Sequence, residues 1–383
     1  MGNQIMQYNW QHPDWPHFTC DAPHGREKIQ QNLLAYTALA NRLAGSVSSL
    51  AKTTQHDALL DIMIDEALKN AAIEGVTLNP EDLRSSLKNQ LGLNKPLERV
   101  GDPRADNMAR LVLQVRETFD ADLNKETLCD WQRLAVSEPR LKDIRLGDWR
   151  NDPSPMQIVS GPIGLERVHY EAPPAAVVPT EMSRFMEWFN TTHPKRGTKP
   201  LGGVIRAALA HMYFESIHPF EDGNGRVGRA LAEKALSQDL GAPVLYSLSG
   251  AMERSKKTYY TALEQASGYS VNVTSWVVYF TETVLSAQQY SEKTIRFVLA
   301  KAKYFTDHTA PLNARQQKAI SRMFEAGHTG FAGGMSAGKY ASLTKTSKPT
   351  ATRDLAYLLE HGYLMRLPGG GRGTKYALNL TVE

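Results

Sequence analysis

The sequence predicts a mainly α-helical fold that is interrupted by one short β-hairpin. Apolar residues recur at steps of three and four along residues 29–43 and 59–71, which is the spacing that places them on one face of a helix. Several later segments, up to residue 290, are also helix candidates. Residues 156–170 differ, because two short β-branched runs there flank a Gly-Pro turn, which is typical of a hairpin.

The composition is that of a globular protein. The 383 residues suggest two or three domains of about 100–200 residues, and 42% hydrophobic with 22% charged residues exclude a long disordered chain. The net charge of +4 is too small for a protein that coats nucleic acid along its whole length. Residues 311–383 hold ten Lys or Arg and four Asp or Glu, so any nucleic-acid contact is expected in that part.

The two cysteines, Cys20 and Cys129, are too few for a disulfide framework, which favours a reducing compartment. No apolar run approaches the roughly 20 residues that span a bilayer. The N-terminal residues also lack the pattern of a signal peptide. We therefore expect a cytoplasmic protein that has no membrane partner.

Three blocks are expected along the chain. Residues 1–110 form an N-terminal helical module, which opens with a segment rich in Trp, His and Pro. The His and Cys residues of that segment fit no standard zinc-finger spacing, so we expect them to pack. Residues 111–300 form a helical domain with the hairpin, and residues 311–383 form a small basic domain after a linker near 301–310. The helices expected in the middle block are 177–190, 201–217, 226–237, 251–267 and 276–290.

The segment 218–229 carries the strongest chemical signal. His218 lies at the end of a buried helix, because Pro219 cannot continue it, and Asp222 follows four residues later. The turn 223–225, Gly-Asn-Gly, opens the next helix, and free backbone amides at such a helix start bind anions. A histidine can act as a general base near neutral pH, and a carboxylate suits Mg²⁺.

Two arginines complete this segment. Arg226 and Arg229 are three residues apart at the start of the second helix, so both can reach the same anion. Together with the turn they predict a site that handles phosphate, whereas the alternative is a structural turn between two core helices. The glycine spacing also matches the dinucleotide-binding fingerprint, but a helix precedes it instead of a strand, which excludes that interpretation.

The segment resembles the signature of Fic domains, His-x-Phe-x-Asp/Glu-Gly-Asn-Gly-Arg-x-x-Arg, and all eight specified residues are present. The resemblance covers residues 111–290. It implies an all-helical core with a β-hairpin flap, and an enzyme that transfers AMP from ATP to a Ser, Thr or Tyr hydroxyl of a target protein and releases pyrophosphate. ATP as substrate and Mg²⁺ are the cofactors that it implies.

The resemblance also assigns roles residue by residue. His218 is expected to deprotonate the target hydroxyl, Phe220 to anchor the loop in the core, and Asp222 to hold Mg²⁺. For Tyr259 and Tyr260 the alternative is a buried aromatic pair that only packs. The residues expected to bind the phosphates and the adenine of ATP are Gly223, Asn224, Gly225, Arg226, Arg229, Tyr259 and Tyr260.

The hairpin at 156–170 stands where the resemblance places the flap, which would align the target segment by strand addition. The flap residues that we expect at the site are Ile158, Val159, Ser160, Gly161, Val168 and His169.

Residues 65–75 lie on an upstream helix and resemble the inhibitory helix of Fic proteins, Ser/Thr-x-x-x-Glu-Gly/Asn. Glu74 and Gly75 match this pattern, while Asn70 stands where Ser or Thr is usual. The resemblance implies that Glu74 pairs with Arg229 and blocks productive binding of the γ-phosphate. The Glu74 carboxylate and the γ-phosphate would compete for the Arg229 guanidinium. The alternative is a surface Glu at a helix end that a Gly closes.

The C-terminal block is predicted to be a winged helix. Helices are expected at 314–326, 340–344 and 348–361, and two strands around a glycine turn within 364–378. Such a module contacts DNA, or alternatively a protein. The side chains that would face DNA phosphates are Lys345, Lys348, Arg353, Arg372 and Lys375.

The sequence thus favours a protein adenylyltransferase that Glu74 inhibits. The alternatives are an enzyme that removes AMP, and a DNA-binding regulator whose Fic domain senses nucleotide. The expected partners are a target protein with a hydroxyl side chain, the chain itself in self-modification, DNA at the winged helix, and a second copy in a homodimer.

Overall fold

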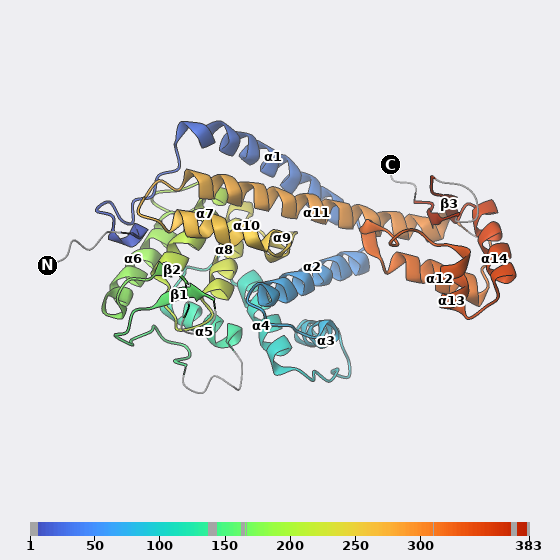
Figure 1. Cartoon of the computed structure of the whole chain (residues 1–383), viewed down its shortest axis with the longest axis horizontal. Coiled ribbons are helices and arrows are strands. Elements are labelled where there is room, and N and C mark those ends of the chain that lie inside the picture. The colour runs from blue at the N-terminus through green and yellow to red at the C-terminus, as the bar shows by residue number, and fades with distance from the viewer. Residues whose placement is uncertain are drawn as a thin grey trace. The chain divides into compact units, whose positions relative to one another are not determined.

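The computed structural model describes residues 7–136, 144–161, 165, 167–308, 310–368 and 374–380. Within these ranges the chain is mainly helical with short β-hairpins, which confirms the predicted fold class (Figure 1). Its contacts divide it into two units, Met1–Ala44 with Leu59–Gln289, and Gly45–Ala58 with Tyr290–Glu383. Three helices contribute to both units: α1 (Pro23–Ser48), α2 (Lys52–Ile73) and α11 (Thr274–Asp307).

The first unit contains most of the other helices and the first hairpin. Its elements are η1 (Asn9–Gln11), α3 (Pro80–Gln90), α4 (Pro103–Glu117), α5 (Lys125–Ala135), β1 (Gln157–Ser160), β2 (Arg167–Glu171), η2 (Ala175–Val177), α6 (Val178–Thr191), α7 (Gly203–Ile217), α8 (Asn224–Leu240), α9 (Leu248–Arg254) and α10 (Lys256–Ala266).

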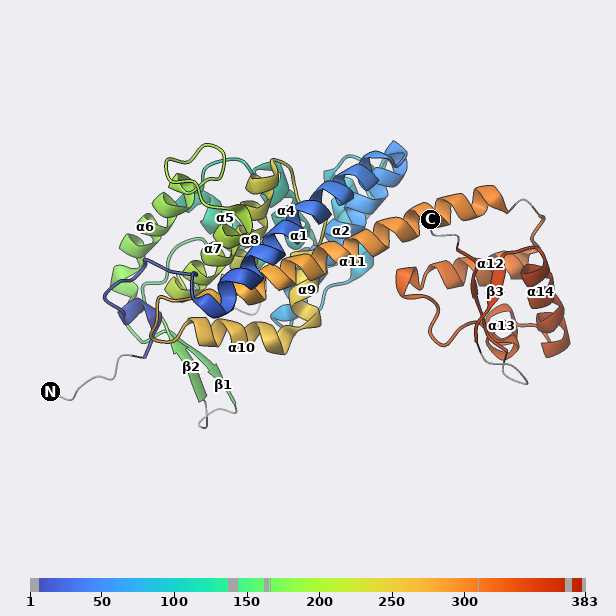
Figure 2. The same cartoon turned by 90° about the horizontal axis from the view of Figure 1, so that it is seen from above.

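The consecutive helices α7 and α8 pack against each other at the centre of this unit (Figure 2). Every residue from 206 to 217 of α7 is buried, which is the pattern of a helix that other helices surround. Aromatic rings fill the space around it. The ring centroids of Phe185 and Phe214 are 5.9 Å apart, and the ring of Trp276 stacks on that of His211 with centroids 5.7 Å apart. The loop between α7 and α8 is therefore held by a well-packed core.

Buried charges connect α8 to its neighbours. Nε of Arg116 on α4 lies 3.0 Å from Oε1 of Glu233 on α8, and both side chains are buried. Glu66 on α2 is also buried, and it accepts hydrogen bonds from the Ser247 hydroxyl at 3.0 Å and the Ser249 N–H at 2.9 Å. A buried carboxylate requires such partners, so α2 and α4 are fixed against the centre of the unit.

The predicted hairpin is present in the described residues. β1 and β2 pair antiparallel, with Ile158 opposite Tyr170 and Val159 opposite Val168, and an irregularity lies between Ile158 and Val159. Residues 162–164 and 166, which belong to the predicted hairpin, lie outside the described residues.

The second unit contains three short helices and a second hairpin. Ala319, Ile320, Tyr340, Leu355 and Leu358 are among the buried residues of its core. Asn313 caps α12, because its side chain accepts from the N–H groups of residues 315 and 316. The elements are α12 (Ala314–Phe324), η3 (Gly327–Thr329), α13 (Ala337–Thr344), α14 (Lys348–Glu360), β3 (Leu364–Arg366) and β4 (Tyr376–Leu378), with β3 and β4 antiparallel.

Two local predictions were wrong. The linker expected near 301–310 is instead largely the end of α11, because Ile295, Ala300 and Tyr304 continue its apolar face and are buried. The single helix expected at 251–267 is two helices, α9 and α10, because Ser255 between them leaves helical geometry at φ −121° and ψ 35°.

None of the described helices combines the length and the apolar character needed to cross a membrane.

We predict that Arg116→Ala lowers the free energy of unfolding by about 3–5 kcal/mol, because Glu233 then stays buried without its partner. Arg110→Ala on the same helix is the matched control. It removes only the exposed pair with Asp106 and is expected to cost about 1 kcal/mol or less. Urea unfolding followed by tryptophan fluorescence measures both values. Equal losses would contradict the role given to the buried pair.

Candidate functional site

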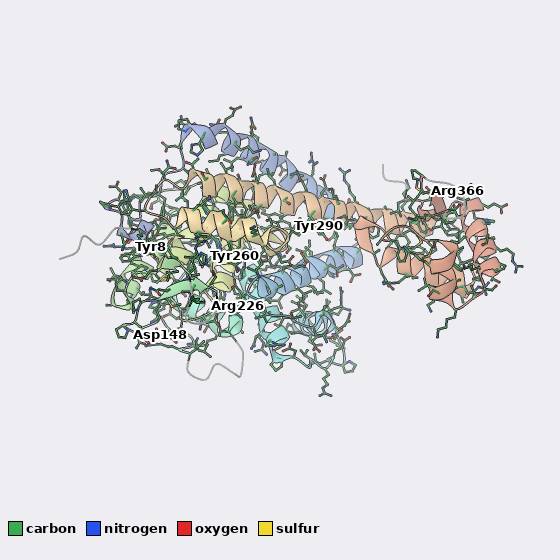
Figure 3. All side chains as sticks on the ribbon, in the orientation of Figure 1. Tyr8, Asp148, Arg226, Tyr260, Tyr290 and Arg366 are labelled. Carbon is green, nitrogen blue, oxygen red and sulfur yellow. The ribbon has the colours of Figure 1, made fainter. Side chains whose placement is uncertain are left out.

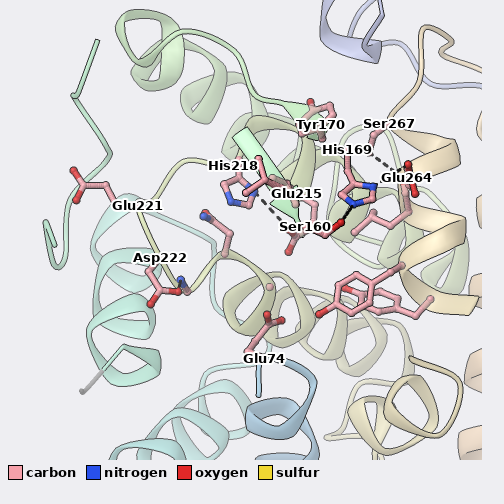
Figure 4. Close-up of a pocket in the computed structure, with 18 residues that line it drawn as sticks. Glu74, Ser160, His169, Tyr170, Glu215, His218, Glu221, Asp222, Glu264 and Ser267 are labelled. Atoms are coloured by element: carbon pink, nitrogen blue, oxygen red, sulfur yellow. Dashed lines mark hydrogen bonds and ion pairs between the residues drawn. The ribbon is translucent and has the colours of Figure 1, made fainter. Parts of the chain in front are cut away.

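A cavity of about 560 Å³ opens where α7 meets α8 in the first unit (Figure 4). It lies between the end of α2, the α7–α8 loop, α10 and the hairpin. The residues that line it are Glu74, Ile158, Val159, Ser160, His169, Tyr170, Glu215, His218, Glu221, Asp222, Gly223, Asn224, Gly225, Tyr259, Tyr260, Leu263, Glu264 and Ser267.

His218 ends α7 in a left-handed conformation, with φ 49° and ψ 60°, which residues with a side chain rarely adopt. Arg150 stabilises this bend, since its Nε donates to the carbonyl of His218 at 2.8 Å. The N–H of Arg150 also donates to the carbonyl of Pro219 at 2.8 Å. The position of the imidazole is therefore fixed from outside its own helix.

The rest of the loop is fixed by two further contacts. The ring of Phe220 is fully buried and lies 5.0 Å from the ring of Trp149. The Asn224 side chain exchanges two hydrogen bonds with the backbone of Phe220, at 2.9 and 2.8 Å. Because these contacts hold the loop, no ligand is needed to form it.

The start of α8 leaves donors free. Gly223 precedes the helix at φ 91°, and no side chain caps the first turn. Among the described residues, the N–H groups of Asn224, Gly225 and Arg226 have no hydrogen-bond partner. Free amides at a helix start can bind an anion, and two of these residues, Asn224 and Gly225, line the cavity.

The carboxylate of Glu74 lies next to Gly225, on the same first turn of α8. A Cβ at Gly225 would be 2.3 Å from Oε1 of Glu74, so the carboxylate rests directly against this glycine. The same oxygen lies 2.8 Å from Nη2 of Arg229, whose side chain is fully buried. Burial would raise the pKa of Glu74, but the Arg229 guanidinium more than offsets this and holds it below its usual value. Glu74 is therefore ionised at neutral pH.

Asn70 is the second partner of Arg229. Its Oδ1 accepts from Nε of Arg229 at 2.7 Å, its carbonyl accepts from Nη2 at 3.0 Å, and its Nδ2 donates to the carbonyl of Arg226 at 3.3 Å. The substitution of Asn for the usual Ser or Thr thus brings a side chain that both donates to α8 and accepts from it.

The end of α2 aims Glu74 at the cavity. Gly75 adopts φ 78°, and the N–H of Val76 bonds the carbonyl of Ala71 at 3.0 Å, which is the hydrogen bonding of a Schellman cap. The glycine that closes the helix and the glutamate in the cavity therefore occur together, so the two interpretations of Glu74-Gly75 do not exclude each other.

Arg226 and Asp222 pair with each other. Nη2 of Arg226 lies 3.0 Å from Oδ1 of Asp222, and Nη1 donates to the carbonyl of Ala135. The second oxygen of Asp222 bonds no described residue and belongs to the cavity wall. One free carboxylate oxygen fits a Mg²⁺ ion that phosphate oxygens also coordinate. The described residues contain no cluster of three metal-ligating side chains.

The imidazole of His218 is held in its neutral form. Burial, together with the charge of Arg150, lowers the pKa of His218 to about 4. Nδ1 of His218 lies 3.8 Å from Oε2 of Glu215, a buried carboxyl on the preceding helical turn (Figure 4). Burial raises the pKa of Glu215 to about 8, so this group is also neutral at pH 7. A neutral imidazole is the form that can accept a proton.

Tyr259 and Tyr260 lie on α10 beside the cavity, with ring centroids 5.0 Å apart. Figure 3 labels Tyr260 on this helix. Tyr259 is buried, and its hydroxyl lies 2.8 Å from Nε2 of His211. Tyr260 is 40% exposed and donates to the carbonyl of Ile73 at 3.2 Å, next to Glu74. Both tyrosines line the cavity, Tyr259 with a buried side chain and Tyr260 with a partly exposed one.

The hairpin is attached to α10. Nε2 of His169 lies 2.5 Å from Oγ of Ser160, and its Nδ1 lies 3.0 Å from Oε1 of Glu264. Arg167 also bonds Glu264, at 3.1 Å. All residues of β1 are exposed, and among the described strands only β2 pairs with it. One edge of β1 is therefore available for a further strand.

The structure brings most of the predicted residues to one cavity. Five of them do not line it, namely Gly75, Gly161, Val168, Arg226 and Arg229. Residues that the sequence analysis missed include Asn70 as a partner of Arg229, and Glu215, Glu264 and Tyr170 on the wall. Glu215 was detectable, because it is a carboxyl on an apolar helix three residues before His218.

Comparison with known families gives two matches. Residues 122–236 match the Fic/DOC family, and residues 8–93 match a domain of unknown function, DUF4172. A probable protein adenylyltransferase of Aquifex aeolicus is 33% identical over 97 residues, which are 25% of this chain and 26% of that protein. A protein adenylyltransferase Fic of Drosophila virilis is 40% identical over 85 residues, 22% of this chain and 16% of that one. The match spans about a quarter or less of these relatives.

Two solved structures share the fold. A Fic family protein from Desulfovibrio desulfuricans has a TM-score of 0.50 and 21% identity, and the match covers 91% of this chain and 95% of that one. A Fic domain containing signaling protein from Bacteroides thetaiotaomicron has a TM-score of 0.52 and 18% identity, with 70% and 97% covered. At this identity the likeness concerns the fold alone.

We predict that His218 stays neutral from pH 8 down to about pH 5, because burial and Arg150 lower its pKa to about 4. NMR titration of the histidine ring signals measures this, and His218→Gln identifies the signal by its loss. A ring that titrates near the ordinary value of about 6.5 would contradict the prediction.

Proposed function

The chain carries a Fic/DOC-family domain at residues 122–236, and on this premise we propose that it transfers AMP from ATP to a hydroxyl side chain of a protein. The observation that carries the proposal is the α7–α8 loop, which brings a neutral imidazole and the free amides of Asn224 and Gly225 to one cavity. The relatives named as adenylyltransferases support it. We assign the reaction to the cytoplasm, since Cys20 and Cys129 are both free thiols.

The proposed reaction forms a bond between the hydroxyl oxygen and the α-phosphorus of ATP. The bond from that phosphorus to the bridging oxygen breaks, and pyrophosphate leaves with the electron pair. The imidazole of His218 takes the proton of the attacking hydroxyl, a contribution of about 10²–10⁴-fold to the rate. The free amides of Asn224, Gly225 and Arg226 stabilise phosphate charge, and such positioning supplies most of the acceleration in phosphoryl transfer.

Asp222 is the residue that fits Mg²⁺, through the carboxylate oxygen that bonds no described residue. The ion would neutralise charge on the phosphates. Tyr260 offers its ring face to the base of ATP, and β1 offers a free edge to an extended target segment.

We further propose that Glu74 inhibits the reaction. Its carboxylate occupies the Gly225 surface that a phosphate needs, and its ion pair holds the guanidinium of Arg229. An anionic phosphate and an anionic carboxylate cannot share this position, because like charges at contact distance repel. Asn70 supports the inhibited arrangement, since it holds Arg229 through two further hydrogen bonds.

We predict that Glu74→Gly raises the transfer of labelled AMP to protein by tenfold or more, because the carboxylate no longer competes with the phosphate at an interaction worth about 1.5–3 kcal/mol. Glu74→Gln keeps the shape without the charge and is expected to give an intermediate rate. Incubation of a cell lysate and of the chain itself with α-labelled ATP, followed by gel autoradiography, measures the transfer.

His218→Ala in the Glu74→Gly background is the control, and it is expected to abolish the label. Label that does not depend on His218, or an unchanged rate in Glu74→Gly, would refute the proposed roles. If wild type removes label from protein that the Glu74→Gly variant has modified, removal of AMP is the activity of the unaltered chain. Mass spectrometry of the labelled proteins identifies the targets and shows whether the chain modifies itself. Self-modification and a homodimer both stay predictions.

Duplex DNA binding by the second unit is a second candidate function, because α13 and α14 form a helix-turn-helix. They are joined by the three residues 345–347, and the buried side of α14 includes Ala351, Leu355 and Leu358. The opposite side exposes Lys348, Thr352 and Arg353 near the start of the helix, which is the part that enters the major groove in such motifs.

The charges of this unit support the same function. Asp354 pairs with Arg315, and Glu325 pairs with Arg322, so two of its acidic groups are neutralised internally. In contrast, the exposed side chains of Lys345, Lys348, Arg353, Arg366 and Lys375 make no ion pair with a described residue. Arg372, which was also expected to face phosphate, lies outside the described residues.

We predict that the double variant Lys348→Glu, Arg353→Glu weakens binding of the full chain to a fluorescent DNA duplex and lowers the salt dependence of log K by about two units, since each phosphate contact contributes about 0.9. Lys195→Glu, Lys199→Glu in the first unit makes the same change in net charge and is the control. Fluorescence anisotropy across a salt series measures both. Equal effects of the two double variants, or no binding by wild type at low salt, would refute DNA binding through α14.

A further inference from the structure

The residues before α1 contain a buried polar side chain that the proposed reaction leaves unexplained. Asn9, in the Trp- and His-rich opening segment, has no exposed surface at all, although asparagine is usually found at the surface. A buried amide requires partners for its donors and its acceptor. The identity of those partners determines what the segment does.

Asn9 bonds three elements that are distant in the sequence. Its Nδ2 donates to the hydroxyl of Ser216 on α7 at 2.8 Å, and its Oδ1 accepts from the hydroxyl of Tyr170 on β2 at 3.2 Å. Its backbone N–H donates to the carbonyl of Ser267, just after α10, at 3.0 Å. One residue thus joins α7, the hairpin and the end of α10.

All three partners belong to the site. Tyr170 and Ser267 line the cavity, and Ser216 lies two residues before His218. The single proton of the Tyr170 hydroxyl is shared between Oδ1 of Asn9 and the backbone carbonyl of Ser216, which is the nearer acceptor at 2.6 Å, so Asn9, Tyr170 and Ser216 contact one another. Burial raises the pKa of Tyr170 far above its usual value, so its hydroxyl remains a donor at neutral pH.

The neighbours of Asn9 brace the same strand. The ring of Tyr8 meets the ring of Tyr170 edge-on, with centroids 5.1 Å apart. Nε1 of Trp10 donates to the carbonyl of Glu171 at 2.8 Å, at the end of β2. The segment 8–10 therefore holds the base of the hairpin from the side that faces away from Glu264.

We propose that Asn9 is a positioning residue, which fixes the base of the hairpin relative to the backbone that carries His218. The proposal rests on the proposed function, in which the hairpin presents the target and the imidazole accepts its proton. Reacting groups must be held closely, since a misplacement of about 1 Å costs about a hundredfold in rate. In this arrangement two residues of the matched segment 8–93 act on the same cavity, Asn9 by ordering it and Glu74 by inhibiting it.

The matched control is Asn32→Ala. Asn32 is also a buried asparagine of the N-terminal part, and its Nδ2 donates to the hydroxyl of Thr281 on α11 at 2.8 Å. Neither residue lines the cavity. Asn32→Ala removes this buried hydrogen bond, which has no link to the hairpin or to His218, whereas Asn9→Ala removes the bonds to Ser216 and Tyr170.

The first measurement is hydrogen exchange of the full chain, followed by mass spectrometry. We expect Asn9→Ala to speed up amide exchange in residues 167–171 and 214–220 by about tenfold relative to Asn32→Ala, since loss of a buried hydrogen bond costs about 1–3 kcal/mol. Ser216→Ala is expected to have a similar effect, and the double variant should add little to either, because both remove the same bond.

The second measurement is transfer of labelled AMP in the Glu74→Gly background. Asn9→Ala is expected to lower the rate constant of transfer by tenfold or more, while the affinity for a fluorescent ATP analogue changes by less than about threefold, because the phosphate-binding loop is untouched. Asn32→Ala should leave both unchanged. Affinity and rate that fall together, or exchange that is the same in both variants, would overturn the positioning role.

These outcomes separate the two proposals. If no variant transfers AMP, including Glu74→Gly alone, the proposed function fails, and the exchange data alone decide whether Asn9 orders the hairpin and the α7 end. If exchange speeds up in Asn9→Ala but transfer does not change, the positioning role is refuted while the proposed function stands.

Discussion

A guanidinium that is completely removed from water sets the conditions for the whole site. Arg229 lies on the first turns of α8 inside an apolar unit, and its charge must be met by acceptors that the fold supplies. Asn70 of α2 and Glu74, just after its end, supply them at 2.7 and 2.8 Å. The packing of α2 and the arrangement of the α7–α8 loop therefore both depend on the buried charge of Arg229. A ligand that replaces Glu74 must itself be negatively charged.

The left-handed conformation at the end of α7 is the second feature on which the site depends, and hydrogen bonds to the backbone stabilise it. His218 adopts a left-handed conformation, and Arg150 from a distant loop bonds its carbonyl. The same guanidinium contributes to the low pKa of the imidazole, next to burial as the larger cause. One arginine thus stabilises the conformation and favours the neutral form that a general base needs, while Glu215 behind the ring stays uncharged.

The sequence predicted what is encoded at short range. The segment 218–229 holds its histidine, carboxylate, turn and arginines within twelve residues, so spacing alone indicated a phosphate site, and the structure does gather most of them. The roles of Asn9 and Arg150 depend on bonds across 207 and 68 residues, and no local pattern marks such pairs. The helix of residues 301–307 was missed for a related reason: its apolar face continues a long helix whose later partners lie far along the chain.

Gly225 has a consequence for how such a chain can change over generations. The absent side chain leaves the surface on which the carboxylate of Glu74 rests, and the same surface belongs to the free amides. On the proposed function, a side chain there would press on the carboxylate of Glu74 and would also narrow the surface that a phosphate uses. A chain that lost the proposed inhibition but kept this surface would therefore change at Glu74 or Asn70 and would keep Gly225, even though this glycine contacts the carboxylate directly.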